Sequence, residues 1–315
     1  MRGISAIMLG GALALLASCG SGAGQGEDCD RECLGGLLDS YLAAMVAHDV
    51  EAAPLATTFR QTENAVAIPL GDGLWRNAAA LGAVDRRYFD PVSGNAAWFG
   101  TLELPGGELS ISSLRLHVRG GEVDEAEWHV TRASDSGIVA GDPAVFDVEN
   151  FIADAPPQWD IPEEERLTRD ELLAVTNSYF DGITSANAAL IQAHPGCRRL
   201  ENGLLVTGPR EQADGTVVES DCMSGQGQFD VALVAGRRYP VVDVEQQAVL
   251  AIATFIRTPD AAKRRNHFME YFYLRGGRIE DVYTAFLYPE PTLPVPHWPP
   301  YDGNFPLPES FGAGQ

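Results

Sequence analysis

The chain has 315 residues, 45% of them hydrophobic, and a formal net charge of −22. This length and composition suffice for one large folded domain or two ordinary ones. The acidic balance argues against nucleic acid as a partner, because nucleic-acid binding needs a basic surface. It also disfavours extended contact with anionic lipid.

Residues 1–18 have the form of a bacterial secretion signal. Arg2 gives a short positive start, and the apolar stretch 4–16 is followed by two small residues and then Cys19. The apolar stretch is too short for a transmembrane helix, which needs about 20 residues. Cys19 resembles the cysteine that becomes the lipidated first residue of mature bacterial lipoproteins. The alternative is an ordinary secretory leader with a chance cysteine.

The residues after Cys19 indicate where the mature chain is held. Residues 19–27 are rich in glycine and predict a flexible tether. Because Gly20, and not an aspartate, follows the cysteine, we expect attachment to the outer membrane on its periplasmic side. The lipid anchor is the only membrane contact that we expect.

Four cysteines follow the predicted lipidation site: Cys29, Cys33, Cys197 and Cys222. An oxidising compartment permits disulfides, and four cysteines allow three pairings. Pairing Cys29–Cys33 and Cys197–Cys222 keeps each bridge local and within one half of the chain. A zinc site is the alternative, but the second half has no His or Cys pair at ligand spacing. We expect two disulfides and no metal or other cofactor.

The chain contains two copies of one pattern. Four ordered matches connect the copies: 39–42 with 177–180, 60–64 with 198–202, 86–88 with 237–239, and 118–121 with 274–277. The offset between matched residues grows from 138 to 156 along the chain. The second copy therefore carries insertions, one of them a Gly-rich polar loop at 209–227.

Each copy begins with a helix, because apolar residues recur at helical spacing over 34–45 and 172–183. In the first copy a short helix or turn follows over 48–55, then a strand over 59–63 and a small helix over 74–81. An antiparallel meander comes last, with strands over 86–89, 96–104, 109–119 and 122–132. A Gly-Gly pair joins the last two strands in a tight hairpin. This order predicts an α+β fold in which a curved sheet wraps around the long helix.

Two segments fall outside the copies. Residues 133–167 form an acidic linker with four prolines, and residues 289–315 form a proline-rich tail. The tail is expected to be extended and polyproline-like, either as a passive extension or as a lid across a groove.

Four short motifs carry a resemblance to a known family. They are Cys29-Asp30-Arg31-Glu32-Cys33, Ala47-His48-Asp49, Thr62-Glu63-Asn64 and Gly73-Leu74-Trp75. Each half resembles a SnoaL-like domain of the nuclear-transport-factor-2-like (cystatin-like cone) superfamily. The whole chain resembles an uncharacterised family of secreted bacterial and fungal proteins that carry such cones.

The resemblance implies two tandem cones, over residues 28–132 and 168–288. Such cones usually pair sheet to sheet, so we expect an intramolecular pseudo-dimer. Members of the superfamily include isomerases, dehydratases, epoxide hydrolases, cyclases and non-catalytic binders. The fold alone therefore does not assign an activity.

Charged residues that match in both copies are expected to serve the framework. Arg60 matches Arg198, and Glu63 matches Glu201. These residues are predicted to form salt bridges or to line the sheet pairing, and the alternative is that each Arg–Glu set binds ligand near a cavity. Trp98 is a further candidate binding residue.

Polar residues without a match are better candidates for a catalytic site. His117 and His129 lie on neighbouring predicted strands, and Glu125 and Glu127 share the face of His129. This stripe is either a solvated or domain-facing surface or a His–Glu acid–base pair.

In the second copy, Glu270 interrupts an apolar stripe that includes Phe268 and Phe272. Burial would raise the pKa of Glu270 and suit it to proton transfer, with Tyr271 or His267 as the acid partner. The alternative is an internal salt bridge. The pattern leaves open which face of this strand lines the cavity.

Two functions remain open at this point. One is a cofactor-independent isomerase, dehydratase or lyase that acts on a small, mostly apolar, oxygenated compound. The other is a non-catalytic lipoprotein that binds a hydrophobic or aromatic ligand, or a protein partner, at the cell envelope. No phosphate-binding loop, Gly-x-Ser-x-Gly elbow or His-Glu-x-x-His motif is present.

Overall fold

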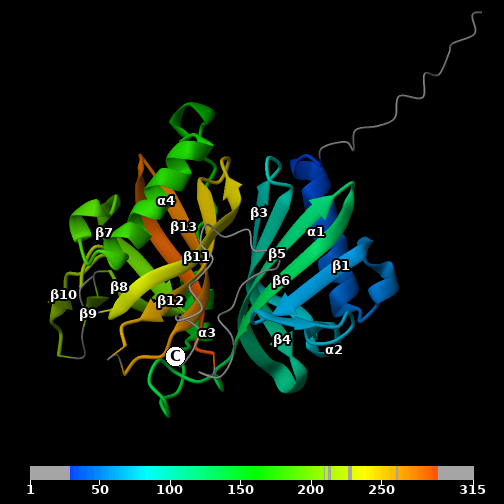
Figure 1. Ribbon diagram of the computed structural model, residues 1–315, viewed down its shortest axis with the longest axis horizontal. Coiled ribbons are helices and arrows are strands. Elements are labelled where there is room, and N and C mark those ends of the chain that lie inside the picture. Colours follow the sequence, from blue (N-terminus) through cyan, green and yellow to red (C-terminus); the bar gives the residue numbers. More distant parts are fainter. Residues whose placement is uncertain (1–28, 209, 212–213, 226–228, 260–261, 290–315) are drawn as a thin grey trace, which may run out of the picture.

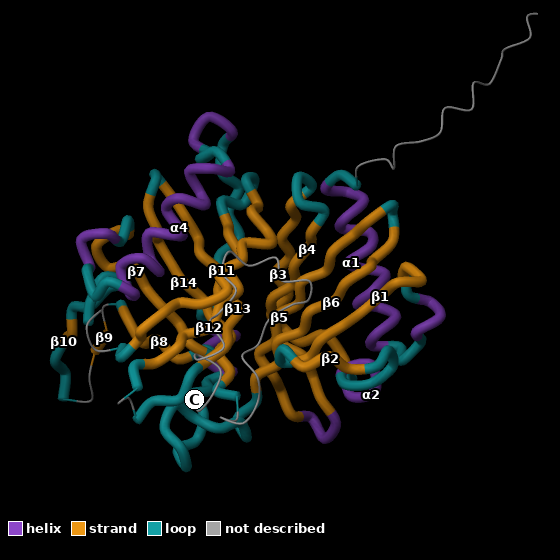
Figure 2. The backbone as a smooth tube through the Cα atoms, in the orientation of Figure 1, coloured by secondary structure: helices purple, strands orange, loops and turns teal. Residues whose placement is uncertain are grey.

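The computed structural model describes residues 29–208, 210–211, 214–225, 229–259 and 262–289. The predicted leader, the whole tether with Cys19 and nearly all of the tail lie outside the described residues. Two curved sheets stand side by side, and each is crossed by one long helix (Figures 1 and 2). Within the described residues, no helix has the length and apolar character needed to cross a membrane.

The first half combines one long helix with a six-stranded mixed sheet. Helix α1 (Arg31–Val46) precedes strands in the order β2-β1-β6-β5-β4-β3. The pair β1 and β6 is parallel, and every other neighbouring pair is antiparallel. The strands are β1 (Leu55–Glu63), β2 (Val66–Ile68), β3 (Ala80–Asp90), β4 (Asn95–Leu104), β5 (Glu108–Arg119) and β6 (Glu122–Thr131). The short helices are η1 (Val50–Ala52), α2 (Leu74–Asn77) and η2 (Pro105–Gly107).

The second half repeats this arrangement. Helix α4 (Arg169–Thr184) precedes a sheet in the order β8-β7-β14-β13-β12-β11, in which β7 and β14 are the parallel pair. The strands are β7 (Ala193–Glu201), β8 (Leu204–Thr207), β11 (Val231–Asp243), β12 (Ala248–Arg257), β13 (Asn266–Arg275) and β14 (Arg278–Leu287). The remaining elements are α3 (Val148–Ala153), η3 (Glu163–Glu165), η4 (Ala188–Leu190), and the two-stranded ribbon of β9 (Arg210–Glu211) and β10 (Val217–Val218).

The structure is richer in strand than the predicted α+β class, because it consists of two six-stranded mixed sheets with few helices. The small helix predicted over 74–81 ends at Asn77. The N–H of Ala79 already donates to the carbonyl of Glu103, so the chain enters the sheet there. The predicted hairpin is present, since Gly120 and Gly121 both have positive φ, 61° and 79°.

Matching local features are consistent with an internal duplication. Asn64 and Asn202 both have positive φ. Each Asn side chain bonds the backbone of one residue on the neighbouring parallel strand, Val130 in the first half and Phe286 in the second. The same rare conformation and the same bonding pattern therefore recur at matched positions.

Three apolar cores hold the molecule together. One core lies between α1 and its sheet, and a second lies between α4 and its sheet. The third forms where the two sheets pack face to face, and Phe99 stacks there on Tyr271 with ring centroids 4.5 Å apart. The hydroxyl of Tyr271 bonds Ser113 at 2.6 Å, so the buried phenol is satisfied across the interface.

A buried aspartate of the first half is bound by the second. Asp90 ends β3 and is almost fully buried. Its carboxylate accepts the backbone N–H of Val242 at 3.0 Å and the guanidinium of Arg169 at 2.6 Å. Arg169 is the first residue of α4, where the helix dipole disfavours a cation. The ion pair with Asp90 offsets that penalty.

A buried aspartate of the second half makes the equivalent contact with the first half. Asp243 ends β11 and is fully buried. Its carboxylate accepts the backbone N–H of Phe89 and the guanidinium of Arg31, each at 2.9 Å. Arg31 is the first residue of α1. Each half therefore inserts one carboxylate under the N-terminus of the other half's long helix.

Both predicted disulfides are confirmed. Cys29–Cys33 closes the start of α1, and Cys197–Cys222 joins β7 to the inserted segment that follows β10. The Cα atoms lie 5.3 Å apart in each bridge, within the range that a disulfide spans.

The reciprocal contact predicts a measurable cost for losing either aspartate. Asp90→Ala removes the carboxylate that binds Arg169 and the N–H of Val242, and Asp243→Ala removes the one that binds Arg31 and the N–H of Phe89, although Arg31 keeps its ion pair with Glu245. Each should lower the free energy of unfolding by about 3 kcal/mol. Asp72→Ala removes the exposed partner of Arg76 and should cost less than about 1 kcal/mol. Denaturant unfolding followed by tryptophan fluorescence compares them, and equal costs for all three variants would contradict the role of the contact.

Candidate functional site

A buried polar cluster lies on the concave face of the second sheet, under α4. Strand register places Glu270 of β13 opposite Thr284 of β14. Glu270 is fully buried, and its Oε1 accepts the Thr284 hydroxyl at 2.7 Å. The same Oε1 accepts two N–H groups of Arg199, both at 3.2 Å. Oε2 of Glu270 has no hydrogen-bond partner.

Arg199 connects this cluster to the surface. Its guanidinium pairs with Glu201 as well as with Glu270 and lies over the ring of Phe286, 5.0 Å from the centroid. Burial raises the pKa of Glu270, although Arg199 opposes the rise. Two carboxylates thus share one buried guanidinium.

The equivalent interior of the first half is filled by large side chains. At the offset of 156 residues between the copies, Leu114 occupies the position equivalent to Glu270, and Trp128 the position equivalent to Thr284. Trp128 packs against the predicted binding residue Trp98, and its indole N–H donates to the Tyr41 hydroxyl at 3.3 Å. Trp98 is fully buried and belongs to this core. The polar cluster is therefore a property of the second half.

A pocket of about 620 Å³ opens beside the cluster. Arg199 and Glu201 form one part of its wall, while Glu270 lies behind them and does not line it. Its aromatic wall consists of Phe229, Phe255, Phe286 and Tyr288, and its other lining residues are Ile138, Val206, Thr207, Val218, Ser220, Ser224, Gly225, Arg257, Lys263 and Asn266.

Two polar atoms on the pocket wall are buried without a hydrogen-bond partner. They are Nδ2 of Asn266 and Oγ1 of Thr207. Buried polar groups in folded proteins are almost always hydrogen-bonded, and each exception requires an explanation. Because both residues line the pocket, rotation of either side chain would turn its polar group toward an oxygen-bearing ligand.

The acid partners predicted for Glu270 lie on the other face of β13. Tyr271 and His267 point into the packing between the two sheets and not into the pocket. Burial raises the pKa of Tyr271 well above its usual value. The structure therefore does not bring Tyr271 or His267 together with Glu270.

The predicted site histidines of the first half are separated from each other. The fully buried His129 ring lies 5.5 Å from that of His267, across the interface between the halves, and neither of its nitrogens has a partner. His117 lies at the edge of that interface, where its Nδ1 is 2.6 Å from Asp124.

The matched charged residues form framework pairs. Arg60 binds Glu125, and Arg198 binds Asp281 at the corresponding place. Glu63 accepts the backbone N–H of Leu74 at the start of α2. Of the four matched residues, only Glu201 lines the pocket of the second half.

Sequence reasoning missed Arg199, Asn266 and Thr207. Arg199 follows the matched Arg198, and its counterpart in the first copy is Gln61. The same mismatch criterion that singled out His117 and His129 therefore also marks Arg199. Asn266 and Thr207 carry no such signal. Within the described residues, no group of three or more potential ligand side chains is arranged to hold a metal.

One family model matches part of the second half of the chain. Residues 165–286 match the family model "Domain of unknown function (DUF8021)". Among curated proteins no match was found.

Two solved structures are similar to parts of the chain. One is described as a protein of unknown function with cystatin-like fold from Methylobium petroleophilum PM1, with 11% identity, 43% of this chain and 98% of that chain covered, and a TM-score of 0.30. The other is a putative ketosteroid isomerase from Kribbella flavida, with 11% identity, 44% and 91% covered, and a TM-score of 0.26.

The buried histidines predict acid sensitivity. Burial lowers the pKa of His267 to about 4 and that of His129 well below its usual value. Unfolded histidine titrates near pH 6.5, so between about pH 6.5 and 4 the unfolded chain binds more protons than the folded chain. The free energy of unfolding should therefore fall as the pH falls through this range.

Urea unfolding between pH 4 and 8 measures the effect. His129→Phe keeps an aromatic ring and removes one titrating group, so it should reduce the slope by up to about 1.4 kcal/mol per pH unit. His194→Gln changes a partly exposed imidazole and serves as the control. Identical slopes in all three proteins would rule out this origin of acid sensitivity.

Proposed function

We propose that the protein is an envelope lipoprotein whose second half binds a small oxygenated ligand with aromatic or aliphatic surface. The observation that carries this proposal is the pair of unpartnered atoms, Asn266 Nδ2 and Thr207 Oγ1, on the wall of an aromatic pocket. Apolar walls with a few placed polar groups are the usual form of a small-molecule site.

Binding fits the geometry better than proton transfer by Glu270. A general base must come within hydrogen-bond reach of the proton that it removes. Glu270 is fully buried, does not line the pocket, and is held by Arg199 and Thr284. We assign Glu270 the role of positioning Arg199, whose guanidinium then faces the ligand together with Glu201.

Removing one hydroxyl from the pocket tests this proposal. Thr207→Val should weaken ligand binding about fivefold, because one neutral hydrogen bond contributes about 1 kcal/mol. The readout is the amount of small molecule that mass spectrometry detects after release from protein purified from its host envelope.

Thr62→Val is the matched control. The hydroxyl of Thr62 is also buried and unpartnered, but it lies in the first half. Both variants should fold with the stability of the wild type, and only Thr207→Val should lose ligand. Equal retention by both variants, or no small molecule on the wild type, counts against the proposal.

The lipoprotein part of the proposal is supported by the position of Cys19 after an apolar stretch and small residues. Cys19→Ser removes the atom that would carry the lipid. This variant should move from the membrane fraction to the soluble periplasmic fraction, as measured by fractionation and immunoblotting. Retention of Cys19→Ser with the membranes would exclude the anchor.

A further inference from the structure

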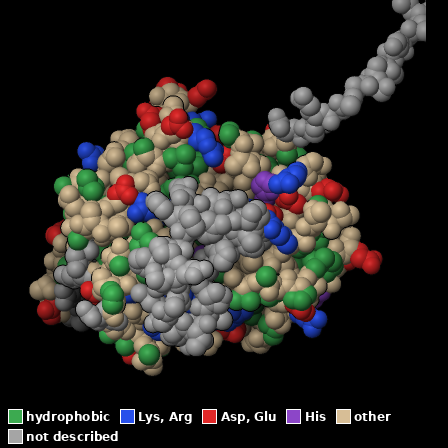
Figure 3. Space-filling view, viewed as in Figure 1, with side chains coloured by type: hydrophobic (Ala, Val, Ile, Leu, Met, Phe, Trp, Pro, Cys, Tyr) green, Lys and Arg blue, Asp and Glu red, His purple; other side chains and the backbone are tan. Residues whose placement is uncertain are grey.

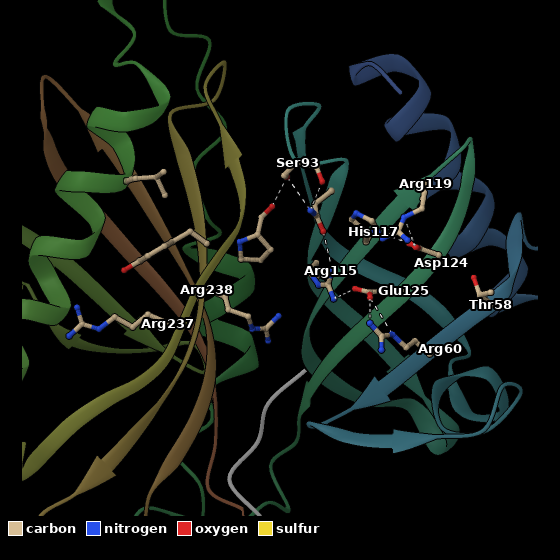
Figure 4. A pocket seen from close by; sticks show the side chains of 14 residues that line it. Thr58, Arg60, Ser93, Arg115, His117, Arg119, Asp124, Glu125, Arg237 and Arg238 are labelled. Carbon is tan, nitrogen blue, oxygen red and sulfur yellow. Dashed lines mark hydrogen bonds and ion pairs between the residues drawn. The ribbon is translucent and has the colours of Figure 1, made fainter. Parts of the chain in front are cut away.

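A second cleft, of about 740 Å³, lies between the two halves and is distinct from the pocket of the second half. Its lining comes from β1, β4, β5 and β6 of the first half and from α4 and β11 of the second. In Figure 4, Arg238 reaches from β11 toward the side chains of the first sheet, while Arg237 points the other way. Arg237 pairs with Asp181 of α4.

A row of alternating charges crosses this cleft. Arg60 binds Glu125, which also binds Arg115 at 2.8 Å. Arg115 binds Glu127 at 3.1 Å, and Arg238 binds the same carboxylate through both terminal nitrogens, at 2.6 and 3.0 Å. Three guanidinium groups from two halves therefore share two carboxylates. Arg238 and Arg115 keep Glu127 ionised by lowering its pKa to about 2, against the effect of burial.

A second group of charges stands beside this row. His117 and Arg119 both approach Asp124, at 2.6 and 3.4 Å. The side chain of Arg119 is 77% exposed, so its guanidinium reaches the solvent at the cleft. Among the described residues, five arginines and one histidine line this cleft together with two carboxylates, and Glu127 lies behind them.

This local excess of basic groups stands out in a chain with a net charge of −22. On the face shown in Figure 3, acidic side chains are scattered over the surface and are not gathered in one patch. Positive charge held between low-dielectric walls attracts anions, because the protein screens it less than water does. Guanidinium groups suit carboxylates in particular, since their planar N–H pairs match two oxygens, as Arg238 and Glu127 demonstrate.

We propose that this cleft binds the carboxylate groups of a ligand that contacts both halves. The hydroxyl of Thr58 also lines the cleft and adds a hydrogen-bonding group for such a ligand, while Asn95 binds Arg115 and Ser93 binds the carbonyl of Pro240. The carboxylates have two possible sources, a free small molecule or the chain's own C-terminal segment. That segment lies outside the described residues and contains Glu290, Asp302 and Glu309.

Titration of the full chain with citrate by calorimetry at low ionic strength tests the proposal. The wild type should bind citrate, and added salt should weaken the binding. The double variant R60Q/R119Q removes two partly exposed guanidinium groups and should bind at least about tenfold more weakly. R76Q, which removes an exposed arginine from α2, should bind like the wild type.

The triple variant E290Q/D302N/E309Q distinguishes the two sources. If the chain's own segment supplies the carboxylates, citrate should bind this variant more tightly than the wild type, and R60Q/R119Q should abolish the gain. If a free ligand supplies them, the triple variant and the wild type should bind citrate equally.

The proposal is overturned if neither protein binds citrate, or if R60Q/R119Q binds it as well as the wild type does. Thr207→Val, which acts on the other pocket, should leave citrate binding unchanged. Each of the two proposed binding sites can therefore be contradicted by experiment without affecting the other.

Discussion

The exchange of buried carboxylates between the halves is the constraint on which the rest of the structure depends. Asp90 and Asp243 each end an edge strand and each bind the other half's backbone and first helical arginine. These contacts fix the position of each long helix relative to the opposite sheet. They thereby fix the face-to-face core, and with it the spacing of the cleft in which Arg238 meets Glu127.

The two halves share an architecture but fill it differently. The first encloses indole rings and a leucine where the second encloses Glu270, Thr284 and Arg199. Both copies keep an apolar core between the long helix and the sheet, and the second copy also buries this polar cluster there. The family match over residues 165–286 covers the copy that holds the polar interior.

The sequence was sufficient for features that depend on local pattern. The two long helices, the Gly-Gly hairpin, the repeated order of elements and both disulfides follow from spacing along the chain. It was insufficient where both faces of a strand are buried. On β13, Phe268 and Phe272 face α4 while Met269 and Tyr271 face the other sheet, so alternation does not distinguish the two sides. Alternation places His267 and Tyr271 on the face opposite Glu270, but it does not show which face lines a cavity, and it gives no sign that Asn266 and Thr207 line a pocket.

The bridge from Cys197 to Cys222 makes the wall of the second pocket sensitive to redox conditions. Cys197 lies two residues before Arg199, and Cys222 lies between Ser220 and Ser224, which line the same pocket. In a reducing compartment this bridge would be absent, and the segment around Cys222 would lose its covalent link to β7. The wall of this pocket therefore depends on the redox state of one disulfide.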